Sequence, residues 1–458
     1  MCRGREGVVT RPQQRYCIIG AGPAGLAQAR AFARRGVAFD VIERHQRIGG
    51  LWDIENPGSP LYESAHFISS RTRSGFLGFP MPASYPDYPR HELILEYLRA
   101  FADAYGLVPH IQLGRSVERV SPSADGAVVR IDGRDVEYAG VVCATGMNWT
   151  PNLPAYPGEF SGVFRHTSTY RRGSELAGKR VLVIGLGNSG ADIACDAARF
   201  ADETIVSVRR GYYFVPKHIF GKPADVFAGE SLWLPKSLRL WLFGILHHWI
   251  VGDTRSLGMP APDHRILQAH PLANDQLLHH LRHGDVTLKA DVERFEGSRV
   301  YFADGTHAEV DEVLAATGYR VSLPYLDPAH VEWQGQRPSH FLSVFSRKHP
   351  ALFTLGFVEL NGALYPHLDH FSALVAEYAH ARVHAPPVAE RFRRIVETTH
   401  LDLAGGTHYV ASPRHDFYCD DEALRRATLQ VFRLAGWNPP NAEAWGPPPA
   451  RAAAALAE

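Results

Sequence analysis

Two stretches of the chain share the same succession of apolar runs, glycine-rich turns and helical segments. In the first, the apolar run YCIIG at 16–20 leads into the turn GAGPAG, a helical run (LAQARAFARRG) and a second apolar run (VAFDVI). From residue 180 the order repeats with RVLVIG, the turn GLGNSG, a helical run (ADIACDAARFA) and the apolar run ETIVSV. Two such strand–turn–helix–strand units predict an α/β fold with two Rossmann-like dinucleotide-binding domains.

The second unit is expected to be an insertion within the first domain. Two further apolar segments, VVCATG and VLAATGY, run into Thr-Gly turns on either side of it, and segments rich in proline and glycine stand next to both. We therefore expect a discontinuous first domain at 15–166 and 316–440, an inserted second domain at 167–315, and a mobile C-terminal tail at 441–458.

The first glycine-rich turn has the residues that a dinucleotide pyrophosphate requires. Gly20 permits the tight turn, Gly22 lets the backbone approach the phosphates, and Gly25 lets helix and strand pack closely. The following helix offers unpaired N–H groups and a partial positive charge at its start. Glu43 ends the second strand, where a carboxylate can accept hydrogen bonds from both ribose hydroxyls. This pattern predicts FAD in the first domain.

The second glycine-rich turn has the same pattern as the first, but a different residue type stands at the end of the strand that follows its helix. Its expected cofactor-binding residues are Gly185, Gly187, Asn188, Ser189 and Gly190. Arg209 and Arg210 then take the place that Glu43 has in the first unit. A carboxylate there would repel a 2′-phosphate, whereas a guanidinium group binds it with two hydrogen bonds. The second domain is therefore predicted to bind NADPH.

Three shorter segments are expected to complete the cofactor sites. The run GGLW places Gly50, Leu51 and Trp52 just after Glu43, with backbone close to a ligand and the indole covering it. The Thr-Gly turns contribute further expected cofactor-binding residues, namely Thr145, Thr317 and Gly318. Asp369 is expected to cap a helix at 371–382.

The segment 160–170 (FSGVFRHTSTY) fits the signature F-x-G-x-x-x-H-x-x-x-[Y/F], and on this signature the chain resembles the class B flavin-containing monooxygenases. The resemblance extends from about residue 15 to residue 382. It implies that NADPH reduces FAD, and that reduced flavin and O2 form a hydroperoxide that gives one oxygen atom to a small organic substrate at sulfur, nitrogen or a carbonyl carbon. An NADPH oxidase or reductase that releases H2O2, a Baeyer–Villiger-type monooxygenase and a non-catalytic nucleotide sensor are the alternatives.

The resemblance also points to candidate catalytic residues and to one departure from the family. Many members have an asparagine about six residues after the tyrosine that corresponds to Tyr62, and 62–70 (YESAHFISS) contains none. Either His66, Ser69 or Ser70 is expected to supply the missing hydrogen bond, or the flavin hydroperoxide is expected to be short-lived. His166, in the signature, is expected to link movement of the NADPH domain to the flavin.

Composition narrows the range of partners. Lys+Arg and Asp+Glu both number 48, so no net charge attracts nucleic acid. The 5 cysteines include no C-x-x-C pair, which argues against a dithiol reductase and for a reducing, cytoplasmic location. No third ligand accompanies His367 and His370, so no metal site is expected. The apolar segment 238–251 is too short to span a membrane, but it is compatible with a peripheral membrane contact, as the chain is with a homodimer.

Overall fold

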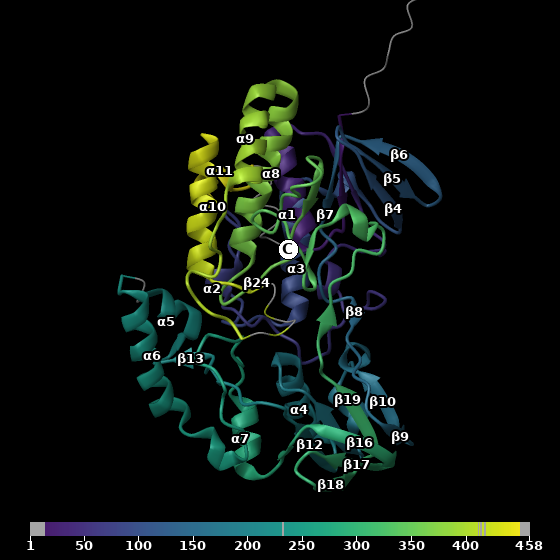
Figure 1. Cartoon of the computed structure of the whole chain (residues 1–458), viewed down its shortest axis with the longest axis vertical. Coiled ribbons are helices and arrows are strands. Elements are labelled where there is room, and N and C mark those ends of the chain that lie inside the picture. Colours follow the sequence, from purple (N-terminus) through teal and green to yellow (C-terminus); the bar gives the residue numbers. More distant parts are fainter. Residues whose placement is uncertain (1–13, 231–232, 411, 413–414, 416–417, 449–458) are drawn as a thin grey trace, which may run out of the picture.

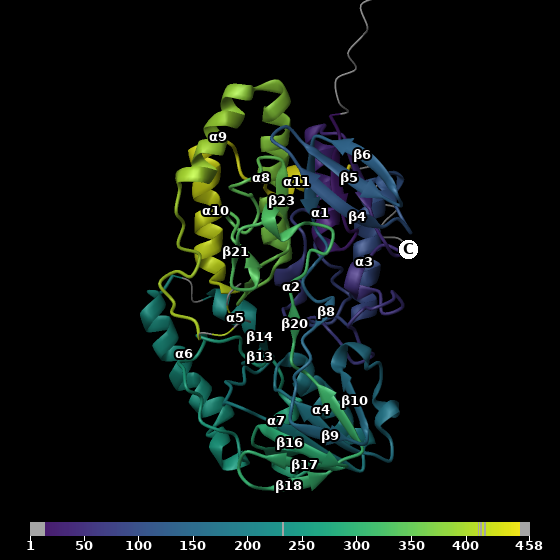
Figure 2. The ribbon, with the colours of Figure 1, turned by 45° about the vertical axis from the view of Figure 1, so that its right-hand side comes forward.

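A computed structural model describes residues 14–230, 233–410, 412, 415 and 418–448, and it consists of two lobes joined by two strands of chain (Figure 1). Each lobe is built on a five-stranded sheet. The larger lobe contains both the N-terminal part of the chain and its C-terminal helices, while the middle of the chain forms the smaller lobe (Figures 1 and 2). The prediction of an α/β fold with two Rossmann-like domains is confirmed.

The sheet of the larger lobe has the strand order β23-β7-β1-β2-β3, and all its pairs are parallel. Its strands are β1 (Tyr16–Ile19), β2 (Phe39–Ile42), β3 (Ile111–Gln112), β7 (Gly140–Cys143) and β23 (Leu352–Thr354). A parallel sheet is covered on both faces, which explains why β1 is apolar at every position. On one face lie α1 (Pro23–Arg35), α3 (His91–Ala104) and α8 (Tyr365–His384). The other face is covered by the meander β4 (Val117–Pro122), β5 (Ala127–Ile131) and β6 (Arg134–Tyr138).

The smaller lobe repeats this architecture. Its parallel sheet has the order β10-β19-β11-β12-β15, formed by β10 (Val163–His166), β11 (Arg180–Ile184), β12 (Glu203–Ser207), β15 (Thr287–Lys289) and β19 (Glu312–Ala315). One face is covered by α4 (Asn188–Phe200) and α7 (Gln276–His283). The other is covered by a second sheet of β9 (Gly158–Phe160), β16 (Val292–Gly297), β17 (Arg299–Phe302) and β18 (His307–Glu309).

Strand pairing places the start of the smaller lobe earlier than the expected residue 167. Both β9 and β10 precede Thr167, and they pair with β16 and β19 of the smaller lobe. The two connections between the lobes pair with each other, since β8 (Thr150–Pro151) runs antiparallel to β20 (Tyr319–Arg320). By its strands, the smaller lobe therefore extends from about residue 158 to residue 315, and a two-stranded ribbon forms the hinge.

The remaining helices cover the C-terminal part of the larger lobe and one edge of the smaller lobe. They are α2 (Arg71–Ser74), α5 (Ala224–Glu230), α6 (Lys236–Val251), α9 (Pro386–Thr398), α10 (Asp421–Ala435) and α11 (Ala442–Trp445). Short paired strands connect them, namely β13 (His218–Ile219), β14 (Lys222–Pro223), β21 (Trp333–Gln334), β22 (Arg337–Pro338), β24 (Glu359–Leu360) and β25 (Tyr418–Cys419). Among the described residues, no helix combines the length and apolar character that crossing a bilayer requires.

One expectation about the C-terminal part is wrong. Asp369 does not cap a helix, because α8 begins earlier, at Tyr365, and the carboxylate is fully buried against the Arg30 guanidinium. Within the expected tail at 441–458, residues 441–444 are exposed, and α11 places Trp445 over Arg30, 4.5 Å from the guanidinium carbon to the ring centre. Residues 449–458 of that tail lie outside the described residues.

Candidate functional site

The first glycine-rich turn has a backbone that side chains would disrupt. Gly20 has φ +108°, and a Cβ atom there would lie 2.8 Å from the Ala144 carbonyl oxygen. A Cβ atom on Gly25 would lie only 1.8 Å from the Gly20 carbonyl oxygen. Gly22 precedes α1 with no side chain capping the helix, so the first N–H groups point out of the turn unpaired by a cap. Such groups are suited to hold a pyrophosphate.

Glu43 lies beside this turn, as expected, and is held as an ion. Its carboxylate accepts hydrogen bonds from the backbone N–H groups of Ala21 (2.7 Å) and His45 (2.9 Å). Burial opposes the charge, but the hydrogen bonds from His45 and Ala21 outweigh it and lower the pKa of Glu43. An ionised carboxylate has further lone pairs available, so it can also accept from ribose hydroxyls.

The second turn has the same geometry. Gly185 has φ +94°, and a Cβ atom there would lie 2.9 Å from the Ala316 carbonyl oxygen. A Cβ atom on Gly190 would lie 2.3 Å from the Gly185 carbonyl oxygen. Gly187 precedes α4, again without a side-chain cap. Asn188 is fixed in the turn because it accepts from the Ala273 N–H (3.0 Å) and contacts His270 (3.1 Å), while Ser189 is exposed.

The two second strands end in opposite charges. Arg209 is exposed and Arg210 half-buried, two and three residues after the end of β12. Within the described part of the chain, neither guanidinium group forms a hydrogen bond or ion pair, although Asp263 lies close enough to Arg210 to feel its charge. Both therefore have N–H groups available for a phosphate.

The run GGLW passes directly over the first turn. Gly50, with φ +60°, brings its Cα so close that a Cβ on it would lie 3.0 Å from the Gly22 Cα. Leu51 is held by the Ser59 hydroxyl, which donates to its carbonyl oxygen (2.7 Å). The Trp52 ring packs 5.1 Å from the Phe67 ring and contacts the cores of both lobes. Trp52 can therefore shield a ligand at the turn from water.

The Thr-Gly turns and His166 meet at the hinge. Thr145 contacts the Tyr325 hydroxyl (3.1 Å), and Thr317 donates to the Asn152 carbonyl oxygen (2.5 Å). His166 donates from Nε2 to the Gly318 carbonyl oxygen (2.9 Å) and accepts at Nδ1 from the Ser168 N–H (3.0 Å). Burial lowers the pKa of His166, so the ring is neutral with both nitrogens engaged. This arrangement suits a residue that positions the hinge.

The two other candidate catalytic residues lie on a loop of the larger lobe that contacts the smaller lobe. His66 donates from Nδ1 to the Ser64 carbonyl oxygen (3.0 Å) and contacts the Lys217 amine through Nε2. Ser69 forms a hydrogen bond with the Ser74 hydroxyl (2.7 Å). Ile68, six residues after Tyr62, is 48% exposed and cannot form the hydrogen bond of the asparagine common in the family.

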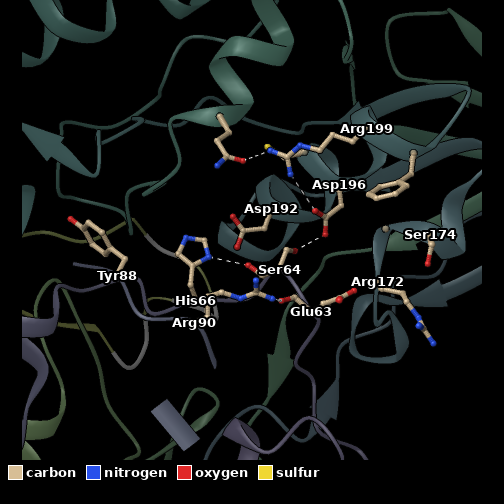
Figure 3. A pocket seen from close by; sticks show the side chains of 14 residues that line it. Glu63, Ser64, His66, Tyr88, Arg90, Arg172, Ser174, Asp192, Asp196 and Arg199 are labelled. Carbon is tan, nitrogen blue, oxygen red and sulfur yellow. Dashed lines mark hydrogen bonds and ion pairs between the residues drawn. The ribbon is translucent and has the colours of Figure 1, made fainter. Parts of the chain in front are cut away.

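An open pocket of about 750 Å³ lies between the lobes (Figure 3). The larger lobe contributes Glu63, Ser64 and His66, and α4 contributes Asp192, Asp196 and Arg199. Of the residues expected from the sequence, His66 alone is among those that line it. The pocket therefore lies along the side of α4, and no residue of the second glycine-rich turn (185–190) lines it.

Sequence reasoning missed an interlobe contact next to this pocket. Tyr62 donates to Asp192 (3.0 Å), which also accepts from Asn274 (2.8 Å). Asp196 accepts from Ser64 (2.5 Å) and from Tyr170 (2.9 Å). In the sequence, this contact is indicated only by the two aspartates in α4. On their own they are typical of the solvent-facing side of an amphipathic helix.

These features define an enzyme of the two-dinucleotide class, in which an acid-ended and an arginine-ended Rossmann-like domain face each other across a hinge. The family described as Flavin-binding monooxygenase-like matches residues 13–415, and the chain belongs to this family. The protein is therefore a flavin-containing monooxygenase that uses FAD, NADPH and O2.

Curated relatives are similar over most of the chain. The indole-3-pyruvate monooxygenase YUCCA1 of Oryza sativa subsp. japonica is 33% identical over 319 residues, which is 67% of this chain and 77% of the relative. The flavin-containing monooxygenase 5 of Cavia porcellus is 31% identical over 383 residues, which is 77% of this chain and 71% of the relative.

Solved structures show the same fold. A flavin-containing monooxygenase from Stenotrophomonas maltophilia has a TM-score of 0.59 at 25% identity, covering 80% of this chain and 98% of that one. The S-allyl-L-cysteine S-oxygenase from Allium sativum has a TM-score of 0.64 at 22% identity, covering 93% of this chain and 89% of that one.

Proposed function

We propose that this monooxygenase inserts one oxygen atom into a small organic substrate at sulfur, nitrogen or a carbonyl carbon, with FAD in the larger lobe and NADPH in the smaller. The observation that carries the residue assignments is the opposite charge at the ends of β2 and β12. Glu43 beside the first turn suits ribose hydroxyls, while Arg209 and Arg210 suit a 2′-phosphate. FAD, when bound, supplies the redox and oxygen chemistry.

The residues of the chain bind, orient and shield the cofactors. The turn 20–25 and the start of α1 would hold the FAD pyrophosphate, and the turn 185–190 and the start of α4 that of NADPH. Trp52 and the GGLW backbone would exclude water from the first turn. His166 would fix the position of the interlobe ribbon through its hydrogen bond to the Gly318 carbonyl oxygen.

A second candidate, an NADPH oxidase that releases H2O2, is favoured by one observation. The half-exposed Ile68 stands six residues after Tyr62, where many members of the family have an asparagine, and its side chain cannot form a hydrogen bond. Without such a partner, the chain would offer a bound flavin less protection from water.

Product analysis distinguishes the two candidates. Purified holoenzyme is supplied with NADPH, O2 and, in turn, a thioether, a tertiary amine, a ketone and a 2-oxo acid. The amine and the 2-oxo acid are chosen because one relative, from Rattus norvegicus, is named an N-oxide-forming dimethylaniline monooxygenase and another is named indole-3-pyruvate monooxygenase YUCCA1. We expect at least one compound to yield an oxygenated product in nearly equal amount to the NADPH consumed, with H2O2 falling accordingly. Stoichiometric H2O2 with every compound would establish the oxidase instead, and a ketone converted to an ester would identify the Baeyer–Villiger type.

A further inference from the structure

Helix α6 carries a row of apolar side chains on its outer surface. Leu238, Trp241, Leu242, Ile245 and Trp249, called the α6 stripe below, recur at the three- and four-residue spacing that places them on one face of a helix. All are exposed, with Trp241 at 62% and Trp249 at 82%. The preceding Trp233 is also 81% exposed. This concentration of exposed indoles is unusual for a surface in contact with water.

The inner face of the same helix carries its polar groups. The Lys236 amine pairs with Asp420 (3.0 Å) at the start of α10, and the Arg239 guanidinium pairs with Glu422 (3.0 Å). Further along, the His247 ring donates to the Phe214 carbonyl oxygen (2.8 Å). The helix is therefore amphipathic in the reverse sense, with cations directed toward the protein and apolar groups directed away from it. That orientation is favourable only if the surroundings of the outer face are apolar.

The dimensions of the α6 stripe limit what can cover it. From Leu238 to Trp249 the helix advances by about 16 Å, and one helix is about 10 Å wide. A strip of this length and width is small beside a stable protein–protein interface, in which each partner buries roughly 800 Å² of accessible surface. Both views place α6 along the outer edge of the smaller lobe (Figures 1 and 2), where a broad flat surface can reach it.

Charge and residue type are consistent with a lipid surface. Residues 231–252 contain no Asp or Glu, and the flanking acids Glu230 and Asp253 are each paired with a cation, Lys222 and Arg255. Tryptophan favours the boundary between headgroups and acyl chains, because its ring is apolar and its N–H can still find a partner. At 16 residues, α6 is shorter than the about 20 that span a bilayer, so it would lie in the plane of the surface.

We propose that the α6 stripe docks this enzyme onto the surface of a phospholipid bilayer, with α6 parallel to the membrane plane. Apolar insertion drives the contact, since Lys236 and Arg239 are already paired with acids of the protein. Binding therefore requires neither anionic lipid nor low ionic strength.

The test is flotation of the FAD-loaded enzyme with vesicles of pure phosphatidylcholine. The variant W241S/W249S removes both exposed indoles, and W333S removes a partly exposed tryptophan of the other lobe as a matched control. We expect the wild type and W333S to float with the vesicles equally at about 0.1 M and about 0.5 M NaCl. The affinity of W241S/W249S should fall at least about tenfold, because losing the burial of two indoles costs more than the roughly 1.4 kcal/mol that a tenfold change represents.

Other outcomes would overturn the proposal. A wild-type enzyme that does not float, or a double variant that floats as well as the wild type, would exclude docking through the α6 stripe. Light scattering that shows a wild-type dimer and a monomeric W241S/W249S would assign the stripe to a second copy of the chain. NADPH oxidation is measured alongside and should be equal in all three proteins, so this test does not depend on the proposed substrate chemistry.

Discussion

At the scale of single residues, two aspartates of α4 connect the lobes. Asp192 and Asp196 accept hydrogen bonds from Tyr62 and Ser64, which belong to the larger lobe. Asp196 also accepts from Tyr170, the last residue of the family signature, whose ring is fully buried. Tyr170 therefore orients the Asp196 carboxylate, which in turn binds Ser64 of the larger lobe. This contact gives a structural reason for a tyrosine at the end of the signature.

The ionisation of Asp192 should make stability depend on pH. Burial raises the pKa of Asp192 to about 6, against the opposing effect of the hydrogen bonds from Tyr62 and Asn274. A carboxyl group with a raised pKa binds its proton more tightly in the folded state, so its contribution to stability falls as pH rises from about 4 to about 6 and stays low above that. The asparagine of D192N does not titrate in this range, so the variant should not lose stability in this way as the pH rises.

We therefore expect the free energy of unfolding of the wild type to fall, relative to that of D192N, by on the order of 1 to 2 kcal/mol between about pH 5 and about pH 8. Urea unfolding at the two pH values measures the difference. The control D202N changes an exposed aspartate at the other end of α4 and should follow the wild type. If D192N and the wild type showed the same pH dependence, ionisation of Asp192 would not lower the free energy of unfolding, and the prediction would be wrong.

At the scale of elements, the two glycine-rich turns share one backbone structure, and each is proposed to hold a different nucleotide. In both, the last glycine lies against the carbonyl oxygen of the first, and an uncapped helix starts at the turn. Replacing Gly25 or Gly190 with alanine forces the turn open, because backbone atoms occupy the place of the new methyl group.

The two alanine variants should have different consequences. G25A is expected to purify with little FAD, because the turn that binds the flavin nucleotide is displaced. G190A should retain FAD and be reduced by NADPH at least about 100-fold less efficiently, a loss of roughly 3 kcal/mol of binding. G244A, within α6, has no atom within 4 Å of the new methyl and serves as the control. Flavin absorbance and anaerobic reduction measure both effects; loss of FAD in G190A would contradict the division of labour between the turns.

How much the sequence predicts depends on the range of the contacts. The glycine-rich turns, Glu43 and the arginine-ended strand were predictable because their residues lie within a few tens of positions of one another. The start of the smaller lobe was not, since β9 and β10 are recognisable only from pairing with strands about 140 residues later. The contact of Tyr62 with Asp192 spans 130 residues, and the burial of Asp369 against Arg30 spans 339. Local patterns carry no information on such pairs.

At the scale of the whole molecule, the hinge and the interlobe contacts fix how the two nucleotide sites face each other. The chain crosses between the lobes through β8 and β20, which are paired with each other, and His166 is bonded to that crossing. Leu61, Tyr62 and Ala65 of the larger lobe are buried in the core of the smaller one. Movement between the lobes must therefore bend the ribbon while this contact slides or opens.

Anaerobic titration of the FAD-loaded enzyme with NADPH and with NADH tests most directly whether the two lobes bind different nucleotides. Arg209 and Arg210 together should favour the 2′-phosphate by roughly 3 kcal/mol, so NADPH should bleach the flavin at about 100-fold lower concentration than NADH. In R209Q/R210Q that preference should largely disappear while FAD remains bound. A protein that does not bind FAD, or a wild type that NADH reduces as readily as NADPH does, would contradict the account.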